Sequence, residues 1–157
     1  MSYASGEALI LTQIQSTDGF NSRNAVRGIY AVLNSGAAKS YAILRPSSFT
    51  NEQTGFGAAL GASHKAQYTV TWTTVCELYV HLRDYGSSLD ELADRRQEII
   101  DRFNAYPQAG DTTSAIEDCS VISAGDVYEI ANQGTPVFLK QELVIQWKEN
   151  TYVTIQE

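Results

Sequence analysis

The clearest pattern in the chain is a two-residue alternation over residues 67–83. One set of alternate positions is mostly apolar and aromatic: Tyr68, Val70, Trp72, Thr74, Cys76, Leu78, Val80 and Leu82. The other set is more polar: Thr69, Thr71, Thr73, Val75, Glu77, Tyr79, His81 and Arg83. This alternation, rich in β-branched and aromatic residues, predicts a β-strand with one buried face and one wetter face.

The predicted strand is too long for a small domain to cover. At about 3.3 Å per residue it would reach about 50 Å, whereas a typical strand has about five to six residues. A domain of this size has a radius of gyration of about 15 Å. We therefore expect that a bulge breaks the strand, or that part of it projects and pairs with something else. A projecting part is a first indication of an assembly protein.

Helical spacing predicts two helices. The first covers residues 6–15 and ends at the polar cluster 17–19. The second begins with Ser88, which together with Glu91 fits a capping box, and it ends before Pro107. Its core positions recur at helical spacing: Leu89, Leu92, Ala93, Arg96, Ile99, Ile100 and Phe103.

Three further strands are predicted at residues 41–45, 116–123 and 137–148. Pro46 closes the first of these strands, because proline cannot donate a hydrogen bond to a neighbouring strand. Residues 26–33 are ambiguous, since apolar residues are dense there but Gly28 favours a short element.

Two loops complete the predicted organisation. Residues 47–66 form a long glycine-rich loop or arm of the kind that is usually functional or flexible, and residues 124–135 form a shorter loop. The order of elements predicts one α+β domain over residues 1–157. Its mainly antiparallel sheet has about four strands, with two helices packed on one face.

Composition narrows the function classes. Hydrophobic residues make up 43% and charged residues 18% of the chain, as in ordinary folded proteins. The net charge of −7 argues against affinity for nucleic acid or for an anionic membrane. A membrane span needs about 20 apolar residues, and no apolar run in the sequence approaches that length. The N-terminus lacks the features of a signal peptide. We expect intracellular synthesis, with Cys76 and Cys119 as reduced, buried thiols.

Candidate chemistry is sparse. The glycine pattern at residues 55–61 lacks the preceding strand that a dinucleotide-binding loop needs. No two of the residues that could ligate zinc have the close spacing of a structural site: His64, His81, Cys76 and Cys119. The carboxylates of the second helix interleave with arginines, as on a solvated helix face. We therefore expect no catalysis, no metal and no cofactor.

The remaining signal is an apolar surface. Val75 and Tyr79 fall on the wetter face of the long strand, and Phe138 and Val144 fall on that of the last strand. If the two strands are neighbours, these side chains form a patch of the kind that marks interfaces. Two aromatic residues of the glycine-rich loop suit the same surface. The candidate interface residues are therefore Phe49, Phe56, Val75, Tyr79, Phe138 and Val144.

The arrangement resembles a known family, the tail terminator and tail-completion proteins of long-tailed bacteriophages. The segments that carry the resemblance cover most of the chain: residues 26–36, 41–46, 71–80, 89–107 and 137–144. These segments share a pattern of predicted helices and strands with the family, and they contain no catalytic motif.

The resemblance implies a non-enzymatic structural protein of the virion. Such proteins form a ring, commonly of six copies, at the head-proximal end of the tail and assemble in the host cytoplasm. The ring binds the last ring of the tail tube protein, stops tube growth and offers a surface to the head connector. DNA passes through its hole without specific binding, and no membrane is involved.

Two other classes remain open. One is a neck or head-completion protein, which docks on the portal side. The other is a small-molecule or peptide-binding domain in which the glycine-rich loop is a lid. This last class predicts a monomer whose loop becomes ordered when ligand binds.

Overall fold

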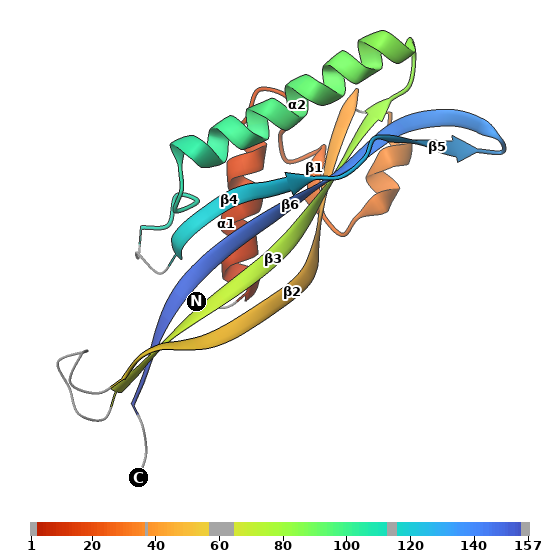
Figure 1. Ribbon diagram of the computed structural model, residues 1–157. Helices are drawn as coiled ribbons and strands as arrows, with labels where there is room; N and C mark the ends of the chain where they lie inside the picture. Colours follow the sequence, from red (N-terminus) through yellow and green to blue (C-terminus); the bar gives the residue numbers. More distant parts are fainter. Residues whose placement is uncertain (1–2, 37, 57–64, 113–115, 155–157) are drawn as a thin grey trace.

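The computed structural model describes residues 3–36, 38–56, 65–112 and 116–154. Within these ranges the chain forms two α-helices, a short 3₁₀ helix and six strands (Figure 1). Their order is α1 (Tyr3–Gln15), β1 (Ala25–Arg27), η1 (Tyr30–Asn34), β2 (Ser40–Phe56), β3 (Lys65–His81), α2 (Tyr85–Ala105), β4 (Ile116–Ala124), β5 (Tyr128–Asn132) and β6 (Thr135–Thr154).

The sheet is mixed, with the strand order β1-β2-β3-β6-β4, and β5 also pairs with β6. β1 runs parallel to β2, whereas the other pairs are antiparallel. The predicted α+β class is confirmed, and β3 and β6, whose adjacency the sequence left open, are neighbours. The expected count of about four strands is too low, because β1 has only three residues and β5 falls in the segment assigned to a loop.

Both helices contribute to the main core on one face of the sheet. Ile10 and Ile14 of α1 and the apolar face of α2 are completely or almost completely buried there. The sheet contributes the alternate positions of β3 that the sequence assigns to its buried face, including Cys76, Leu78 and Val80. Within the described ranges, no helix combines the length and the hydrophobicity needed to cross a membrane.

The opposite face of the sheet is buried as well. Tyr41, Ile43, Tyr79 and Phe138 form a second cluster, which Val32 and Leu33 of η1 and Ile130 of β5 cover. The expectation of a wetter face is therefore wrong in this part of β3. The prediction failed because the cover comes from η1 and β5, two short elements whose sequences show no clear periodicity.

Three strands continue far beyond the helices. β2, β3 and β6 extend together toward the lower left of Figure 1, and we call residues 48–56, 65–73 and 146–154 the arm and the rest the body. The pairing of β3 with β6 has no register shift, so projection rather than a bulge explains the length of β3. The strand end expected at Pro46 is wrong, because β2 continues through a bulge between Pro46 and Ser48. Proline is tolerated there because β2 is an edge strand at that point.

Helix α2 begins earlier than the capping box suggests. Asp84 is its N-cap, and the Asp84 Oδ2 atom accepts a hydrogen bond from the Ser87 backbone N–H at 3.0 Å. Ser88 lies inside the helix, where its hydroxyl donates to the His81 carbonyl. Glu91 accepts a hydrogen bond from Ser40, so the proposed Ser88–Glu91 box is not formed. The end before Pro107 is confirmed.

Candidate interaction surfaces

The two faces of the arm differ in character. Helix α1 begins at Tyr3 near the root of the arm, so α1 does not cover the sheet farther out along the arm (Figure 1). The cross-strand register places these residues on the α1 side of the arm: Phe49, Asn51, Gln53, Ala66, Tyr68, Val70, Trp72, Trp147, Glu149, Thr151 and Val153. Ala66, Trp147 and Glu149 are buried. The opposite face is rich in threonine and other polar residues: Thr50, Glu52, Thr54, Thr69, Thr71, Thr73, Lys148 and Asn150.

An aromatic ladder marks the root of the arm. The Trp72 and Trp147 rings stack with centroids 5.7 Å apart, and Phe49 lies 5.1 Å from Trp72 on the other side. Tyr3 of α1 covers both indoles, 5.1 Å from Trp72 and 5.7 Å from Trp147. Trp147 is fully buried, whereas Phe49 is 62% exposed. The ladder therefore passes from the core to solvent across three strands.

Two shallow hollows follow this ladder along the α1 side of the arm. The first, about 200 Å³, lies between Tyr3, Phe49 and Trp72. The second, about 390 Å³, is lined by Asn51, Tyr68, Val70, Thr151 and Val153. No charged side chain lines either hollow among the residues that the structure describes. Each hollow can accept an apolar or aromatic side chain of another molecule.

Within the described ranges, the β2 edge of the arm lacks a strand partner, and the β6 edge lacks one beyond Glu149. β1 pairs with β2 only as far as Leu44, and β4 pairs with β6 only as far as Glu149. Beyond these points, the outer backbone groups of β2 and β6 face away from the sheet. Unpaired strand edges of this kind are templates for pairing with another chain.

The body, in contrast, encloses an ionic network beneath η1. Glu77 is 3% exposed, and its Oε1 atom lies 2.6 Å from the Lys140 Nζ atom. Tyr30 of η1 donates a hydrogen bond to Glu77. The Arg45 Nε atom lies 3.7 Å from the Glu77 Oε2 atom. The network ties η1 to the sheet.

The network fixes the charge states of its members. Burial alone would raise the pKa of Glu77, but the hydrogen bonds from Lys140 and Tyr30 hold that pKa below its usual value. The hydrogen bond to Glu77 raises the pKa of Tyr30 to about 12. Because the carboxylate is surrounded by groups of the same subunit, we interpret the network as a structural device.

The residues considered for metal or thiol chemistry lie apart. Cys76 and Cys119 are free and buried, and burial raises the pKa of the Cys119 thiol to about 12. His81 packs on Phe138, with ring centroids 4.4 Å apart. No group of three or more His, Cys, Asp or Glu residues that could hold a metal ion occurs in the described part of the chain. His64 lies outside that part, as do residues 57–61 of the glycine pattern.

The six candidate interface residues do not form one exposed patch. Phe49 is exposed on the arm, and Val144 is half-buried and pairs with Val75. Val75, Tyr79 and Phe138 are 6%, 5% and 7% exposed, so their expected exposure is wrong. For Tyr79 and Phe138 the reason is the cover of the second cluster by η1 and β5. The side chain of Phe56 lies outside the described residues.

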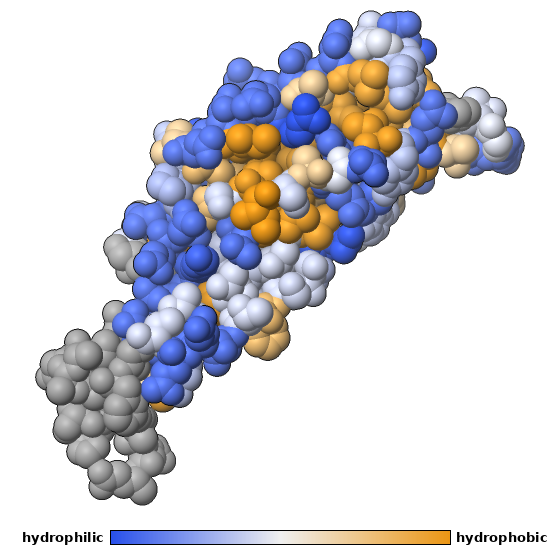
Figure 2. Space-filling view, in the orientation of Figure 1, coloured by the Kyte–Doolittle hydropathy of each residue, from blue (hydrophilic) through white to orange (hydrophobic). Residues whose placement is uncertain are grey.

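Other exposed apolar side chains were missed by the sequence analysis. They occur in or directly beside η1, α2, β4, β5 and the arm: Ile29, Tyr30, Tyr85, Tyr106, Ile122, Tyr128 and Val153. In the view of Figure 2, hydrophobic side chains gather over the body, whereas the arm is mostly hydrophilic. The alternation of residues 149–153 continues that of β6 and was the available signal for Val153.

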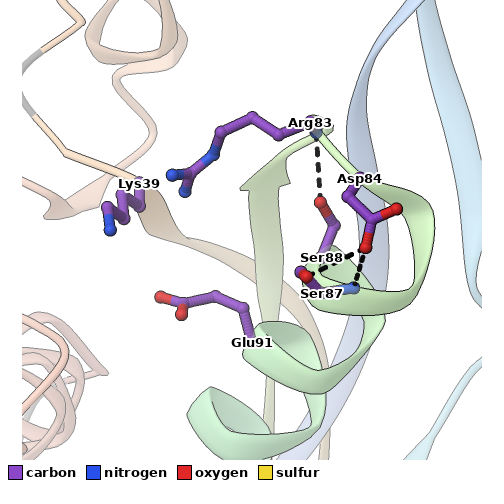
Figure 3. Close-up of a pocket in the computed structure, with 6 residues that line it drawn as sticks. All are labelled: Lys39, Arg83, Asp84, Ser87, Ser88 and Glu91. Carbon is purple, nitrogen blue, oxygen red and sulfur yellow. Dashed lines mark hydrogen bonds between the residues drawn. The ribbon is translucent and has the colours of Figure 1, made fainter.

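A polar hollow lies at the other end of the sheet (Figure 3). Its volume is about 320 Å³, and Lys39 and Arg83 extend into it from the start of β2 and the end of β3. The first turns of α2 form its other wall. Its lining combines these two cations with Asp84 and Glu91, whereas a neighbouring hollow of about 410 Å³ shares Lys39 and Arg83 and has no carboxylate in its described lining.

Comparison with known proteins does not assign a family. A scan against protein-family models gives no match, and a search of curated proteins finds no similar sequence. The functional argument therefore depends on the surfaces described above.

Proposed function

We propose that this chain is a structural virion protein that forms a ring on the end of a phage tail tube. The ring ends polymerisation of the tube and provides the surface to which the head attaches. The observation that supports this proposal most strongly is the arm, whose β2 edge and outer β6 edge are unpaired in the described ranges and whose one face carries two hollows with no charged lining residue. The resemblance of several sequence segments to tail terminator proteins points in the same direction.

The arm suits an assembly protein for a physical reason. An unpaired edge beside a bare apolar face invites strand addition, in which backbone hydrogen bonds supply affinity and side-chain hollows supply specificity. A ring needs heterologous contacts, in which one patch meets a different patch and rotation closes the circle. An arm that reaches away from one body toward the next provides such a contact.

The charge of the chain is compatible with a DNA channel. A net charge of −7 repels phosphate groups, so DNA can pass the ring without adhering to it. The threonine-rich face of the arm is nearly uncharged, with Glu52 and Lys148 as its charged members in the described part. This feature is consistent with a surface that neither attracts nor strongly repels a passing duplex.

Tails assembled without this protein test the proposal directly. We expect overlong tubes, measured by electron microscopy, and normal lengths when the purified protein is added back. Tubes of normal length that lack heads would contradict termination and favour the neck or head-completion role.

A second measurement separates these two roles. The purified protein is mixed either with isolated tail tubes or with tail-less capsids and then pulled down. We expect capture by the tubes. Capture by neither particle would overturn both assignments.

A further inference from the structure

Two exposed cations lack a counterion within their own subunit. Lys39 and Arg83 lie within ion-pair distance of no carboxylate in the part of the chain that the structure describes. The two carboxylates that line the same hollow are already engaged. Asp84 accepts hydrogen bonds from the backbone and the hydroxyl of Ser87, and Glu91 accepts one from Ser40. A second hollow of about 410 Å³ shares Lys39 and Arg83 with the one in Figure 3, and no carboxylate is among its described lining residues. On that side the two cations present an uncompensated positive surface.

The outer face of α2 presents the opposite charge. Asp90, Asp94 and Asp101 are exposed, and their spacing places them on one side of the helix. The neighbouring arginines of α2, Arg95, Arg96 and Arg102, form hydrogen bonds or ion pairs within their own subunit.

Each of these arginines has a partner on its own subunit. Arg95 binds Glu98, Arg96 donates to Gln141 and Arg102 donates to Gln13. None of the three exposed aspartates forms an ion pair with a described cation. A row of uncompensated carboxylates thus follows the outer side of α2.

We propose that these two surfaces meet between neighbouring copies of this chain. The carboxylate row of one copy, Asp90, Asp94 and Asp101, docks at the hollow that contains Lys39 and Arg83 on the next copy. This inference rests on the proposed function in that it identifies one subunit contact of the ring.

Three physical arguments support a second copy as the occupant. The two patches are opposite in charge and lie at different places on the subunit, as a heterologous contact requires. Copies with a net charge of −7 repel one another, so the cationic hollow is where an acidic neighbour can approach most easily. Exposed ion pairs are weak individually, so this contact sets the orientation of neighbours while the arm supplies apolar contact.

Charge reversal with mixing tests the contact. The first variant carries Lys39→Glu and Arg83→Glu, and the second carries Asp94→Lys and Asp101→Lys. Each variant alone places like charges in contact, so we expect self-association to weaken about 10-fold or more in sedimentation velocity over a concentration series.

An equimolar mixture of the two variants should regain association. Every contact between unlike variants joins opposite charges, so the variants are expected to alternate around a ring with an even number of copies. This rescue separates the specific contact from an effect of net charge. A variant with Ser22→Glu, Arg23→Glu and Gln108→Glu undergoes the same change in net charge at exposed positions outside the hollow and the arm, and we expect it to associate as the wild type does.

The outcomes distinguish this inference from the proposed function. If reversal has no effect, if mixing gives no rescue, or if the wild-type chain stays monomeric at every concentration, the inference is overturned. The proposed function is then judged separately by tube length in tails. Circular dichroism of each variant confirms that it folds. Because association in the mixture requires both variants to be folded, rescue by mixing also excludes misfolding as the cause of weak self-association.

Discussion

The body and the arm are built from the same three strands but differ in what covers them. In the body, neighbouring residues of β3 point to opposite faces and are both buried: Leu78 is 1% exposed beneath the helices and Tyr79 is 5% exposed beneath η1 and β5. In the arm, the side chains of β3 between Gln67 and Thr73 are only half-buried on either face. β3 and β6 continue from body to arm without a change in register, so burial of their side chains depends on the neighbouring elements rather than on the strands themselves.

This difference separates folding from assembly. The body holds two clusters of buried side chains and can account for the stability of the subunit. The arm adds backbone pairing but little enclosed apolar area, so its side chains are available for contact with another molecule. Substitutions in the two regions should therefore affect different measurements.

The sharpest test compares two truncations on the same strand and the same face. Leu78→Ala in the body should cost about 2–5 kcal/mol of unfolding free energy, because it leaves a cavity in the core. Val70→Ala in the arm should cost less than about 1 kcal/mol, since Val70 is half-buried. Urea denaturation measures both values. Equal losses would show that the arm is covered in solution, and the comparison would fail.

The second test concerns the ionic network that only the body contains. Glu77→Gln should cost about 3 kcal/mol at neutral pH, because it leaves Lys140 with a weaker counterion in a buried site.

The pH dependence of that loss has a definite sign. The pKa of Glu77 is lowered in the folded state, so its contribution is present above the unfolded pKa of about 4.3 and is lost as pH falls through the lower folded value. The difference in unfolding free energy between wild type and variant should shrink on acidification. A difference that stays constant down to strongly acidic pH would contradict this account.

A third test probes the boundary between body and arm. A Cβ atom on Gly6 would lie 2.1 Å from the Trp147 side chain, so Gly6→Ala must displace α1 or the stacked indoles. We expect a loss of about 1–3 kcal/mol in thermal unfolding. Gly86→Ala is the matched control, since the nearest atom to its Cβ would be at 3.6 Å. A similar loss in both variants would show that the contact with Trp147 does not matter.

The smallest effect on stability is expected in the arm. Phe49→Ala removes an exposed ring that stacks on Trp72, which should cost about 1 kcal/mol or less. Self-association should nevertheless weaken about 10-fold, because exposed aromatic residues dominate interface energies. Tyr106→Ala removes another exposed ring outside the arm and should leave association unchanged. Light scattering over a concentration series compares them, and unchanged association of the Phe49 variant would exclude this side chain from the contact.

Much of the fold could be predicted from periodicity because its long elements have clear faces. The two helices, the core of β3 and the adjacent strand β6 each repeat their pattern over many residues. The short elements could not be found in this way: β1 has three residues, and η1 has five. The start of α2 was missed because two residues one turn apart are both good N-caps. Asp84 caps the helix by accepting from the Ser87 backbone N–H, whereas the sequence pattern favoured Ser88.

The candidate surface was predicted less well than the fold, for a related reason. Alternation reports which side chains share a face, but it does not report what lies above that face. Tyr79 and Phe138 belong to a cluster that Leu33 of η1 and Ile130 of β5 cover, and the periodicity of the sequence predicts neither of these two short elements. Phe49 is exposed because the cover by α1 stops at Tyr3.

The bulges in β2 determine the shape of the arm before any partner binds. β2 advances twelve residues from Leu44 to Phe56, whereas β3 advances only ten over the paired span from Cys76 to Ala66. An edge strand with surplus length must curl around its neighbour, and covalent connectivity maintains that curvature in the isolated subunit. The arm is thus preorganised, so little conformational entropy remains to be lost when a ring closes.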